Sequence, residues 1–576
     1  MKRIVCLSLF TLFFAMVSIS VASSGDVDGK GTAGLEDAIM GLQVCTGIAV
    51  TPDTNADVNG DKKIGLQEVV FILQYAAGIR TDTTTYTLSG TVSGTVISGV
   101  TITLSGTASS TATTDSSGNY SFTVAAGSYT VTPTLSGYSF SPAGTSVTVS
   151  NANVSGVDFS STSAASTIGD RTDYTSVTLT SGGTYSSNAS GVEKQYFQYT
   201  SAASDTPAAK VSGGGSLALT NSKVTKSGGA TASEDNSNFY GVNAGVLASS
   251  STKVSGYSAG TASAITMTDC TITTGVNGAN GAFAFGEDAV ITLDHVTIVT
   301  TAWSSRGVDA TYGGTVNISN SAISTQGEHC GALATDRYES ADPPKINAEN
   351  CVATTAGKGS PGIYCTGTFT VTDSTLTATG SEAAVIEGLN SITLADTHIL
   401  GADKWGVMIY QSMSGDSSVG TGTFRMTRGT LTNNSTGPLF FVCNTTAVIE
   451  LSGATLTSNS DTLLWATTAA AGSAVNSNVN SGWGTKGGTV TFTAANQTLT
   501  GNIDLEESSS SVKLTLTNSS LSGAVNPGNT GKAVLSIDAD SSWVVTGDSY
   551  LTGLTNNGTI SGTGKVYVNG TVVYTP

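Results

Sequence analysis

Charged residues, and basic residues above all, are scarce in this sequence. Only 11% of its 576 residues are charged, and 23 Lys and Arg stand against 41 Asp and Glu, for a formal net charge of −18. Proteins that bind nucleic acid neutralise phosphates with clustered positive charge. The composition therefore argues against a nucleic-acid partner.

Long apolar runs are missing after the first residues. The start, MKRIVCLSLFTLFFAMVSISVAS, combines Lys2 and Arg3 with an apolar stretch and a small-residue cleavage site. These features are typical of a secretory signal peptide, here residues 1–23. No later run reaches the roughly 18 apolar residues of a membrane helix. We expect an exported protein, extracellular or on a bacterial cell surface, without a transmembrane segment in the mature chain.

The cysteines follow no pattern. Of the seven, Cys6 lies in the predicted signal peptide, and the others lack the close, regular spacing of a disulfide framework or a zinc site. These others are Cys45, Cys270, Cys330, Cys351, Cys365 and Cys443. We predict small buried or half-buried side chains rather than bridged pairs.

The sequence is rich in Gly, with 69 residues, and in Ser and Thr, while residues that favour helices are few. Such a composition favours strands and turns over helical bundles. We therefore predict a mainly β protein, with any helical part small.

One stretch near the N-terminus has the spacing of a calcium loop. DVNGDKKIGLQE follows the start of the EF-hand pattern D-x-[DN]-x-[DN]-G, with Lys62 in place of the usual Gly. Calcium takes six to eight oxygen ligands. The predicted ligands are Asp57, Asn59, Asp61, the carbonyl of Lys63, and Glu68. Upstream, DVDGKGTAGLED offers a second site from Asp26, Asp28 and Asp37, weakened by Lys30 at its third ligand position.

Two such loop–helix halves resemble a dockerin domain over about residues 24–80, within a predicted module of residues 24–84. The resemblance implies Ca²⁺ as cofactor and a cohesin-like protein partner. The alternative is that calcium only folds the module, because the degenerate first loop can also have lost the partner surface.

Residues 85–162 alternate short apolar–polar runs with turn signals such as Asp115–Gly118. This segment resembles the transthyretin-like β-sandwich of carboxypeptidase regulatory domains. It carries no cluster of titratable residues, so the resemblance implies a spacer.

The remainder, residues 163–576, repeats one short phrase. VTDSTLTATG from Val371 returns as MTDCTITTG from Met267 and LTNSSLSG from Leu516, and most neighbouring copies lie 23 to 32 residues apart. Asn or Asp often stands two residues after the first apolar residue, and both tolerate the left-handed backbone of a tight bend. A period of this length indicates a solenoid whose stacked turns share one core.

This pattern resembles the right-handed parallel β-helix of pectate lyases, adhesins and phage tailspikes, over about residues 165–576. The resemblance is specific for the fold. It does not settle function, because that fold carries lyases, hydrolases, adhesins and inert fibres alike.

A second phrase, such as GVMIY from Gly406, runs out of phase with the first. Side chains of a strand alternate between faces, so its second and fourth positions should point inward and its third and fifth outward. The outward column is rich in aromatic residues, which stack on sugar rings. The predicted ligand-binding residues in and beside it are Phe283, Phe285, Tyr312, Tyr364, Trp405 and Tyr410. Alternatively, long loops such as YQSMSGDSSVGTG cover this face, or it is an ordinary packing surface.

Charged residues accompany that column. A hydrolase needs two facing carboxylates, and a lyase of the pectate type needs acids with an Arg base. The candidate catalytic residues are Asp309, Asp336, Glu387, Arg306 and Arg337, with Glu382 as a further acid. Scattered acids are also common on solvated faces, and the sequence shows no compact lyase motif.

Three functions remain open from the sequence. The favoured one is a secreted or surface protein whose β-helix binds a polysaccharide, a cell-surface glycan or another surface partner. The alternatives are a polysaccharide lyase or glycoside hydrolase, and a purely structural extracellular fibre.

Overall fold

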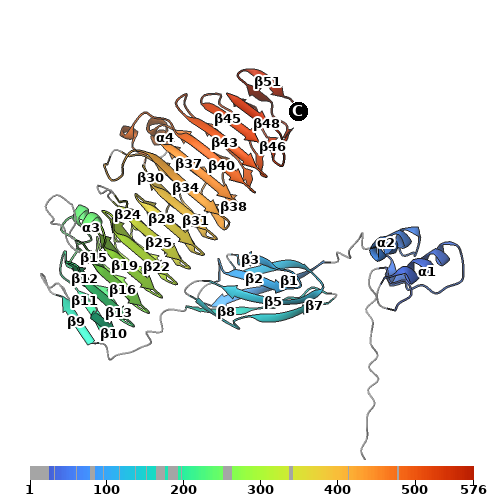
Figure 1. The fold of residues 1–576 in the computed structure, drawn as a ribbon, viewed down its shortest axis with the longest axis horizontal. Coiled ribbons are helices and arrows are strands. Elements are labelled where there is room, and N and C mark those ends of the chain that lie inside the picture. The colour runs from blue at the N-terminus through green and yellow to red at the C-terminus, as the bar shows by residue number, and fades with distance from the viewer. Residues whose placement is uncertain are drawn as a thin grey trace, which may run out of the picture.

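The fold was obtained as a computed structural model, and the residues that it describes fall into several ranges. These are 25–30, 33–59, 61–77, 85–94, 97–115, 117–135, 138–150, 152–163, 175–179, 192–195, 197–250, 262–336, 342–412, 414–475 and 479–576. The predicted signal peptide and Arg337 lie outside the described residues. Figure 1 shows three parts in chain order: a small helical module, a β-sandwich and a long solenoid.

The helical module consists of α1 (Leu35–Cys45), η1 (Thr54–Ala56) and α2 (Leu66–Ala76). Its core includes Val27, Ile64 and Ile72. The two α-helices pack closely, because a Cβ at Gly41 would lie 2.7 Å from Cγ2 of Val69. No helix of the described ranges is long and apolar enough to cross a membrane.

The β-sandwich has two sheets of four strands. One contains β4 (Asn119–Ala125), β1 (Thr85–Gly94), β8 (Phe159–Ser163) and β6 (Tyr138–Ser141). The other contains β3 (Ser110–Thr113), β2 (Thr101–Gly106), β5 (Gly127–Thr134) and β7 (Thr145–Val149). Alternate side chains of β4 are buried, as expected for a strand with one face on a core. The predicted sandwich is therefore confirmed.

The solenoid is built from three long sheets in which every pair of neighbouring strands is parallel. The first sheet has 14 strands: β10 (Val192–Gln195), β13 (Ser216–Thr220), β16 (Ala264–Thr268), β19 (Val290–Asp294), β22 (Thr315–Ser319), β25 (Lys345–Glu349), β28 (Thr368–Thr372), β31 (Ser391–Ala395), β34 (Thr421–Thr427), β37 (Thr446–Ser452), β40 (Thr489–Ala495), β43 (Ser511–Thr517), β45 (Lys532–Ile537) and β48 (Gly553–Asn556).

The second sheet has 11 strands: β9 (Thr175–Leu179), β11 (Phe197–Ser201), β14 (Lys223–Lys226), β17 (Thr271–Thr274), β20 (Thr297–Thr300), β23 (Ala322–Thr325), β26 (Val352–Thr355), β29 (Thr375–Ala378), β32 (His398–Gly401), β35 (Thr430–Asn433) and β38 (Thr455–Ser458). The third also has 11: β12 (Ala209–Ser212), β15 (Val246–Ser249), β18 (Ala282–Phe285), β21 (Val308–Thr311), β24 (Leu333–Asp336), β27 (Ile363–Cys365), β30 (Ala384–Glu387), β33 (Val407–Tyr410), β36 (Phe440–Cys443), β39 (Thr462–Thr467) and β42 (Asn502–Leu505).

Two short sheets complete the C-terminal coils. One contains β41 (Thr498–Thr500), β44 (Ser520–Ser522), β46 (Ser542–Val545) and β49 (Thr559–Gly562). The other contains β47 (Ser549–Leu551), β50 (Val566–Val568) and β51 (Thr571–Tyr574), with β51 antiparallel to β50. Three further short elements lie outside the sheets: α3 (Glu234–Tyr240), α4 (Ala469–Val475) and η2 (Ser481–Trp483).

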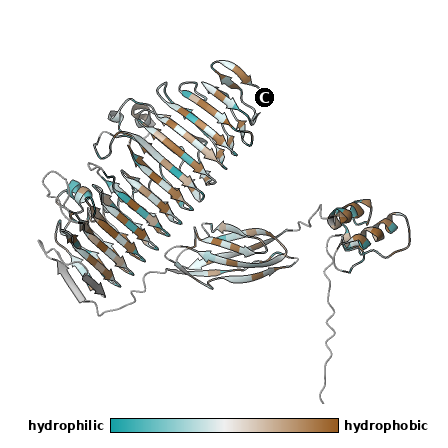
Figure 2. Ribbon diagram, viewed as in Figure 1, coloured by the Kyte–Doolittle hydropathy of each residue, from teal (hydrophilic) through white to brown (hydrophobic). Residues whose placement is uncertain are grey.

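Most coils contribute one strand to each long sheet, and the last coils contribute strands to the short sheets instead of the second and third long sheets. The inward side chains of successive coils form one continuous core. Figure 2 shows the apolar residues recurring as bands across the successive strands of the solenoid. The predicted mainly β fold with a parallel β-helix is therefore confirmed.

The corner that follows the strands of the first sheet repeats one backbone conformation. The residue two positions after the apolar anchor has a positive φ in coil after coil: Asn221, Asp269, His295, Asn320, Asn350, Asp373, Asp396, Arg428, Gly453, Asn496 and Asn518. The backbone N–H of each of the first ten donates to a carbonyl of the next coil, as Asn320 does to Glu349 at 3.1 Å. We call this row the corner ladder. It confirms the bend that the repeated Asn and Asp predicted.

Buried cysteines belong to similar rows inside the coils. Sγ of Cys330 accepts the backbone N–H of Ser305 at 3.0 Å, and the N–H of Cys330 donates to Oγ of Ser360 at 2.9 Å. Cys and Ser therefore alternate as acceptors of a backbone N–H from the preceding coil. The six described cysteines are free, and five are buried, as predicted. Cys45 is exposed, contrary to the prediction, because the end of α1 leaves it outside the module core.

Replacement of Cys330 tests whether its sulfur is an obligatory acceptor. We expect Cys330→Ser to unfold at nearly the same denaturant concentration as the parent. Cys330→Ala leaves the buried N–H of Ser305 unpaired and should lower the free energy of unfolding by about 1–3 kcal/mol. Denaturant unfolding of the full chain measures both, with Cys45→Ala as the exposed control. Equal midpoints for the Ser and Ala variants would contradict the prediction.

Candidate functional site

The outer face of the third sheet carries the predicted site residues. The inward positions follow the expected alternation, as for Val308 and Ala310, which lie in the core. One coil departs from it: Ala334 pairs with Asp309 and Tyr364, so it shares their outward row, while Leu333 lies in the core. The alternation therefore slips by one residue at β24, because the strand enters the sheet one residue later than its Gly-x-x-x-x phrase implies.

The aromatic side chains of the outward row were predicted to be exposed. That prediction is wrong, because other parts of the chain cover them. Phe283, Phe285 and Tyr312 pack beneath Phe239 and Tyr240 of α3. Trp405 and Tyr410 pack with Phe441 and with residues of the α4–η2 segment. Figure 1 shows α3 and α4 on the same side of the solenoid. We call α3, the described residues of 411–420 and the α4–η2 segment the cover. Of the six predicted residues, only Tyr364 is more than about a tenth exposed.

Three of the predicted catalytic residues do meet beneath this cover. Nη2 of Arg306 lies 2.6 Å from Oδ2 of Asp336, and its Nε lies 3.6 Å from Oδ2 of Asp309. Its Nη1 donates to Oδ1 of Asn238 in α3 at 2.6 Å. The guanidinium thus joins two coils of the sheet to the cover, which is the arrangement of a structural clamp.

Asp309 has the least favourable environment in this cluster. It is fully buried, and neither carboxylate oxygen accepts a hydrogen bond of normal geometry. Burial raises the pKa of Asp309 well above its usual range, Arg306 opposes that rise, and Asp336 adds to it. Two carboxylates that share one buried cation cannot both ionise cheaply, so the site favours the protonated form of Asp309.

Glu387 lies in a separate cluster farther along the same face. It accepts hydrogen bonds from the hydroxyls of Tyr410 at 2.7 Å and Tyr364 at 3.2 Å, and from the hydroxyl of Ser412 in the cover. Burial raises the pKa of both tyrosines well above its usual range, and the charge of Glu387 adds to the rise. Both tyrosines remain proton donors, and Glu387 ties the cover to the sheet.

An open cleft begins where the cover ends. It has a volume of about 470 Å³. We call it the tryptophan cleft, and the residues that line it are Trp405, Thr436, Gly437, Pro438, Ser460, Thr462, Trp465, Asp504, Leu505, Glu506, Gly528 and Thr530. Trp405 was expected at the ligand-binding surface, and it lines this cleft although only 3% of it is exposed.

The two tryptophans of the cleft are fixed through Phe441. The rings of Trp405 and Phe441 stack with centroids 3.9 Å apart and planes 6° apart, and the ring of Trp465 lies 5.1 Å from Phe441 at 55°. Phe441 is fully buried, whereas Trp465 is half-buried. The cleft therefore presents a rigid aromatic surface that is held from behind.

Two carboxylates lie beside that surface. Oε2 of Glu506 accepts a hydrogen bond from Nε1 of Trp465 at 3.1 Å, and Oδ2 of Asp504 accepts one from the hydroxyl of Thr462 at 3.1 Å. Burial raises the pKa of Asp504, the hydroxyl of Thr462 opposes the rise, and the charge of Glu506 adds to it. The cleft thus combines an aromatic plane with fixed acceptors.

Sequence reasoning missed Trp465, Asp504 and Glu506. Trp465 and Asp504 are register partners in the row that also holds Phe441. Their strands lie around the insertion that contains α4 and η2, which breaks the period used to find the column. The alternation in Ile503-Asp504-Leu505 places Asp504 outward and is the available signal.

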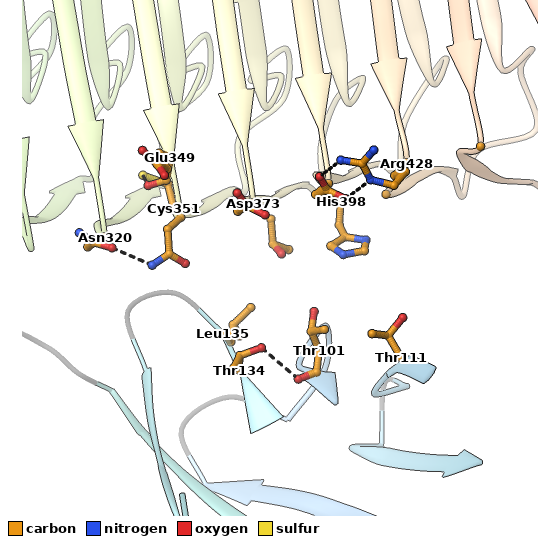
Figure 3. A pocket seen from close by; sticks show the side chains of 15 residues that line it. Thr101, Thr111, Thr134, Leu135, Asn320, Glu349, Cys351, Asp373, His398 and Arg428 are labelled. Carbon is orange, nitrogen blue, oxygen red and sulfur yellow. Dashed lines mark hydrogen bonds and ion pairs between the residues drawn. The ribbon is translucent and has the colours of Figure 1, made fainter. Parts of the chain in front are cut away.

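A second cleft, of about 730 Å³, lies between the corner ladder and the sandwich (Figure 3). On the solenoid side its polar groups already pair with one another. Nδ2 of Asn350 donates to Asn320 at 2.7 Å, and Nε of Arg428 donates to Asp396 at 2.6 Å. Among the described residues that line it, none is Phe, Tyr or Trp. These groups serve the corner, and we assign no ligand to this cleft.

The helical module places the predicted calcium ligands in two equivalent loops. In the first, oxygens of Asp26, Asp28 and Asp37 all lie within 4.8 Å of one another. Lys30 extends outward, with Nζ 2.9 Å from Asp28. The sequence ranked this loop second, yet the close group of three carboxylates is here.

The second loop holds Asp57, Asn59 and Asp61 in a chain of turns, in which Asn59 Oδ1 accepts the N–H of Asp61 at 2.8 Å. The N–H of Lys63, whose carbonyl is the fourth predicted ligand, donates to Asp61 at 2.9 Å. Glu68 is 1% exposed, and its Oε1 has no hydrogen-bond partner. An unpaired buried carboxylate oxygen is what a calcium ligand shows without its ion, so these residues fit Ca²⁺.

Comparison with known proteins reaches one part of the chain. Residues 84–162 match the family model of the second β-sandwich domain of the BOS complex subunit NOMO1-like proteins. No curated protein and no solved structure matches the chain. The match agrees with the sandwich of the structure and concerns no other part.

Asp309→Asn tests the buried proton. Because burial raises the folded pKa, the folded protein keeps a proton that the unfolded chain loses above about pH 4. Stability from this site is therefore lost as the pH rises, and we expect the variant to exceed the parent in thermal midpoint at neutral pH. The difference should vanish near pH 4.

Asp396→Asn is the matched control. The hydrogen bond from Arg428 lowers the pKa of Asp396, so its contribution exists above about pH 4 and disappears as the pH falls. This variant should lose stability at neutral pH instead. A fall in midpoint of Asp309→Asn at every pH would show that Asp309 is ionised and paired with Arg306.

Proposed function

We propose that this chain is an exported, modular protein whose β-helix binds a polysaccharide at the tryptophan cleft. The observation that carries the proposal is the half-buried Trp465, held by Phe441 behind it and bonded to Glu506 beside it. A flat aromatic plane stacks on the apolar face of a sugar ring, and neighbouring carboxylates accept hydrogen bonds from its hydroxyls.

The dimensions of the cleft suit a chain of sugars. Its lining comes from successive coils, from Trp405 before β33 to Asp504 on β42. Parallel strands are about 4.8 Å apart, so the three steps from β33 to β42 span roughly 14 Å. The cleft is also open at its surface, which lets a polymer enter from the side.

Trp465→Ala tests this proposal. Loss of the stacking plane should weaken retention of a bound polysaccharide by about tenfold, because an aromatic contact contributes roughly 0.5–1.5 kcal/mol beyond its buried area. The parent and variant are compared by affinity electrophoresis against a panel of plant, algal and bacterial polysaccharides. Trp303→Ala is the matched control, since Trp303 is a half-buried tryptophan that does not line the cleft.

The same panel separates the other functions. Unchanged polymer length with retention supports binding alone, whereas shortened polymer would favour a lyase or hydrolase with Asp504 and Glu506 as its acids. If no polymer is retained, the solenoid is a structural fibre and the proposal is wrong.

We further propose that the helical module docks to a protein when calcium is bound. Both helices expose an apolar stripe at equivalent positions: Leu35, Ile39 and Leu42 on α1, and Leu66, Val70 and Leu73 on α2. All six are more than 40% exposed. Apolar side chains of this size, repeated at helical spacing on one surface, are typical of an interface. The resemblance to dockerins supports a cohesin-like partner.

Calcium would be held by Asp57, Asn59, Asp61, Lys63 and Glu68, and by Asp26, Asp28 and Asp37. It would supply the positive charge that these inward oxygens lack. The ion would join each loop to the first turn of its helix, because Asp37 and Glu68 stand in those turns and already accept the N–H of Gly34 and Gly65.

Glu68→Gln tests the metal. Loss of one carboxylate should weaken calcium binding by roughly 10–100-fold, measured by isothermal titration calorimetry on the full chain. Glu36→Gln, an exposed acid at the start of α1, is the control and should bind as the parent does. Equal affinity of Glu68→Gln and the parent would contradict calcium binding in the second loop.

A further inference from the structure

The charge of the tryptophan cleft restricts which sugars it can hold. Among the described residues that line it, two are acidic, Asp504 and Glu506, and none is Lys, Arg or His. Both acids lie beside Trp465, one as its register partner in the next coil and the other as its hydrogen-bond acceptor. The cleft therefore presents negative charge against an aromatic plane.

The nearest basic residue along the chain does not offset this charge. Lys404 precedes Trp405, but its Nζ lies 3.5 Å from Oε1 of Glu382, and its side chain is only 12% exposed. Just after β42, Glu507 adds another carboxylate, which accepts hydrogen bonds from the hydroxyls of Thr467 and Thr468. The charged residues that line the cleft are thus acids alone.

We infer that the tryptophan cleft selects an amine-bearing polysaccharide, one whose sugars carry protonated amino groups. This inference rests on the proposed function and names the class of its ligand. An ammonium group beside Asp504 and Glu506 meets two carboxylates, and it also lies against the negative face of Trp465. No neutral hydroxyl obtains either interaction at comparable strength.

The partial burial of Asp504 supports the same conclusion. A carboxylate that is removed from water beside another carboxylate is unfavourable without a counter-charge. The hydroxyl of Thr462 donates a single neutral hydrogen bond to this carboxylate. A bound ammonium group supplies the missing positive charge, whereas a uronic acid or sulfated sugar would add a third negative group and be repelled.

The test compares three hexasaccharides on the full chain: glucosamine with free amines, its N-acetylated counterpart, and galacturonic acid. Isothermal titration calorimetry is performed under conditions that keep the amine protonated. We expect the free-amine hexamer to bind at least about tenfold more tightly than the acetylated one, and the galacturonate hexamer to bind least. Added salt should reduce the preference for the amine.

Asp504→Asn and Glu506→Gln identify the residues responsible. Each should lower the affinity for the free-amine hexamer more than the affinity for the acetylated hexamer, and the thermal midpoint of each variant verifies that it is folded. Equal binding of the free-amine and acetylated hexamers by the parent, or tightest binding of galacturonate, overturns the inference.

Trp465→Ala separates a failure of the amine selectivity from a failure of the proposed polysaccharide binding. If this variant loses every hexamer while the parent shows no preference for the amine, the cleft binds sugar and only the selectivity is wrong. If Trp465→Ala binds all three hexamers as the parent does, the cleft is not the site, and the proposed function falls with the inference.

Discussion

The left-handed corner residue is the constraint on which the solenoid depends. With φ near +50°, residues such as Asn320 and Asp373 turn the chain sharply while their backbone N–H still reaches a carbonyl of the next coil. The turn therefore closes each coil and fixes its register against the next in one interaction. A register shift of one residue would move every apolar side chain of a strand to the outer face, so the corner also protects the core.

In-register stacking aligns equivalent side chains of successive coils in rows. A row on the outer face is exposed to water unless another part of the chain covers it. Along the third sheet the row that holds Phe283, Met408 and Phe441 is mostly apolar, with Asp309 interrupting it, and an exposed strip of this kind is unfavourable in water. The cover meets that requirement. Where the cover ends, at Trp465, the same row becomes accessible. The tryptophan cleft is thus a consequence of how far the insertion extends.

Much of the fold could be predicted because its signals are local and repeated. The corner residues, the alternating core positions and the unpaired cysteines each follow from residue type and spacing. The cover could not, because it depends on loops whose contacts, such as Asn238 with Arg306, join residues far apart in the sequence. The outward direction of Phe283 was therefore predictable, and its burial was not. The slip at β24 and the site at Trp465 were missed for a similar reason, since both lie where the period is interrupted.

The two sets of acids on this face show why residue type alone does not identify a site. Asp336 pairs with the cation of Arg306, burial favours the protonated form of Asp309, and Glu387 is surrounded by hydroxyl donors, so these acids leave little unpaired charge. Asp504 and Glu506 instead accept hydrogen bonds from neutral donors, the Thr462 hydroxyl and the Trp465 indole. Their charge is consequently directed toward the open cleft. A ligand responds to the field that remains after internal pairing. The acids beside Trp465, and not those near Arg306, are therefore the ones that bind a ligand in our proposal.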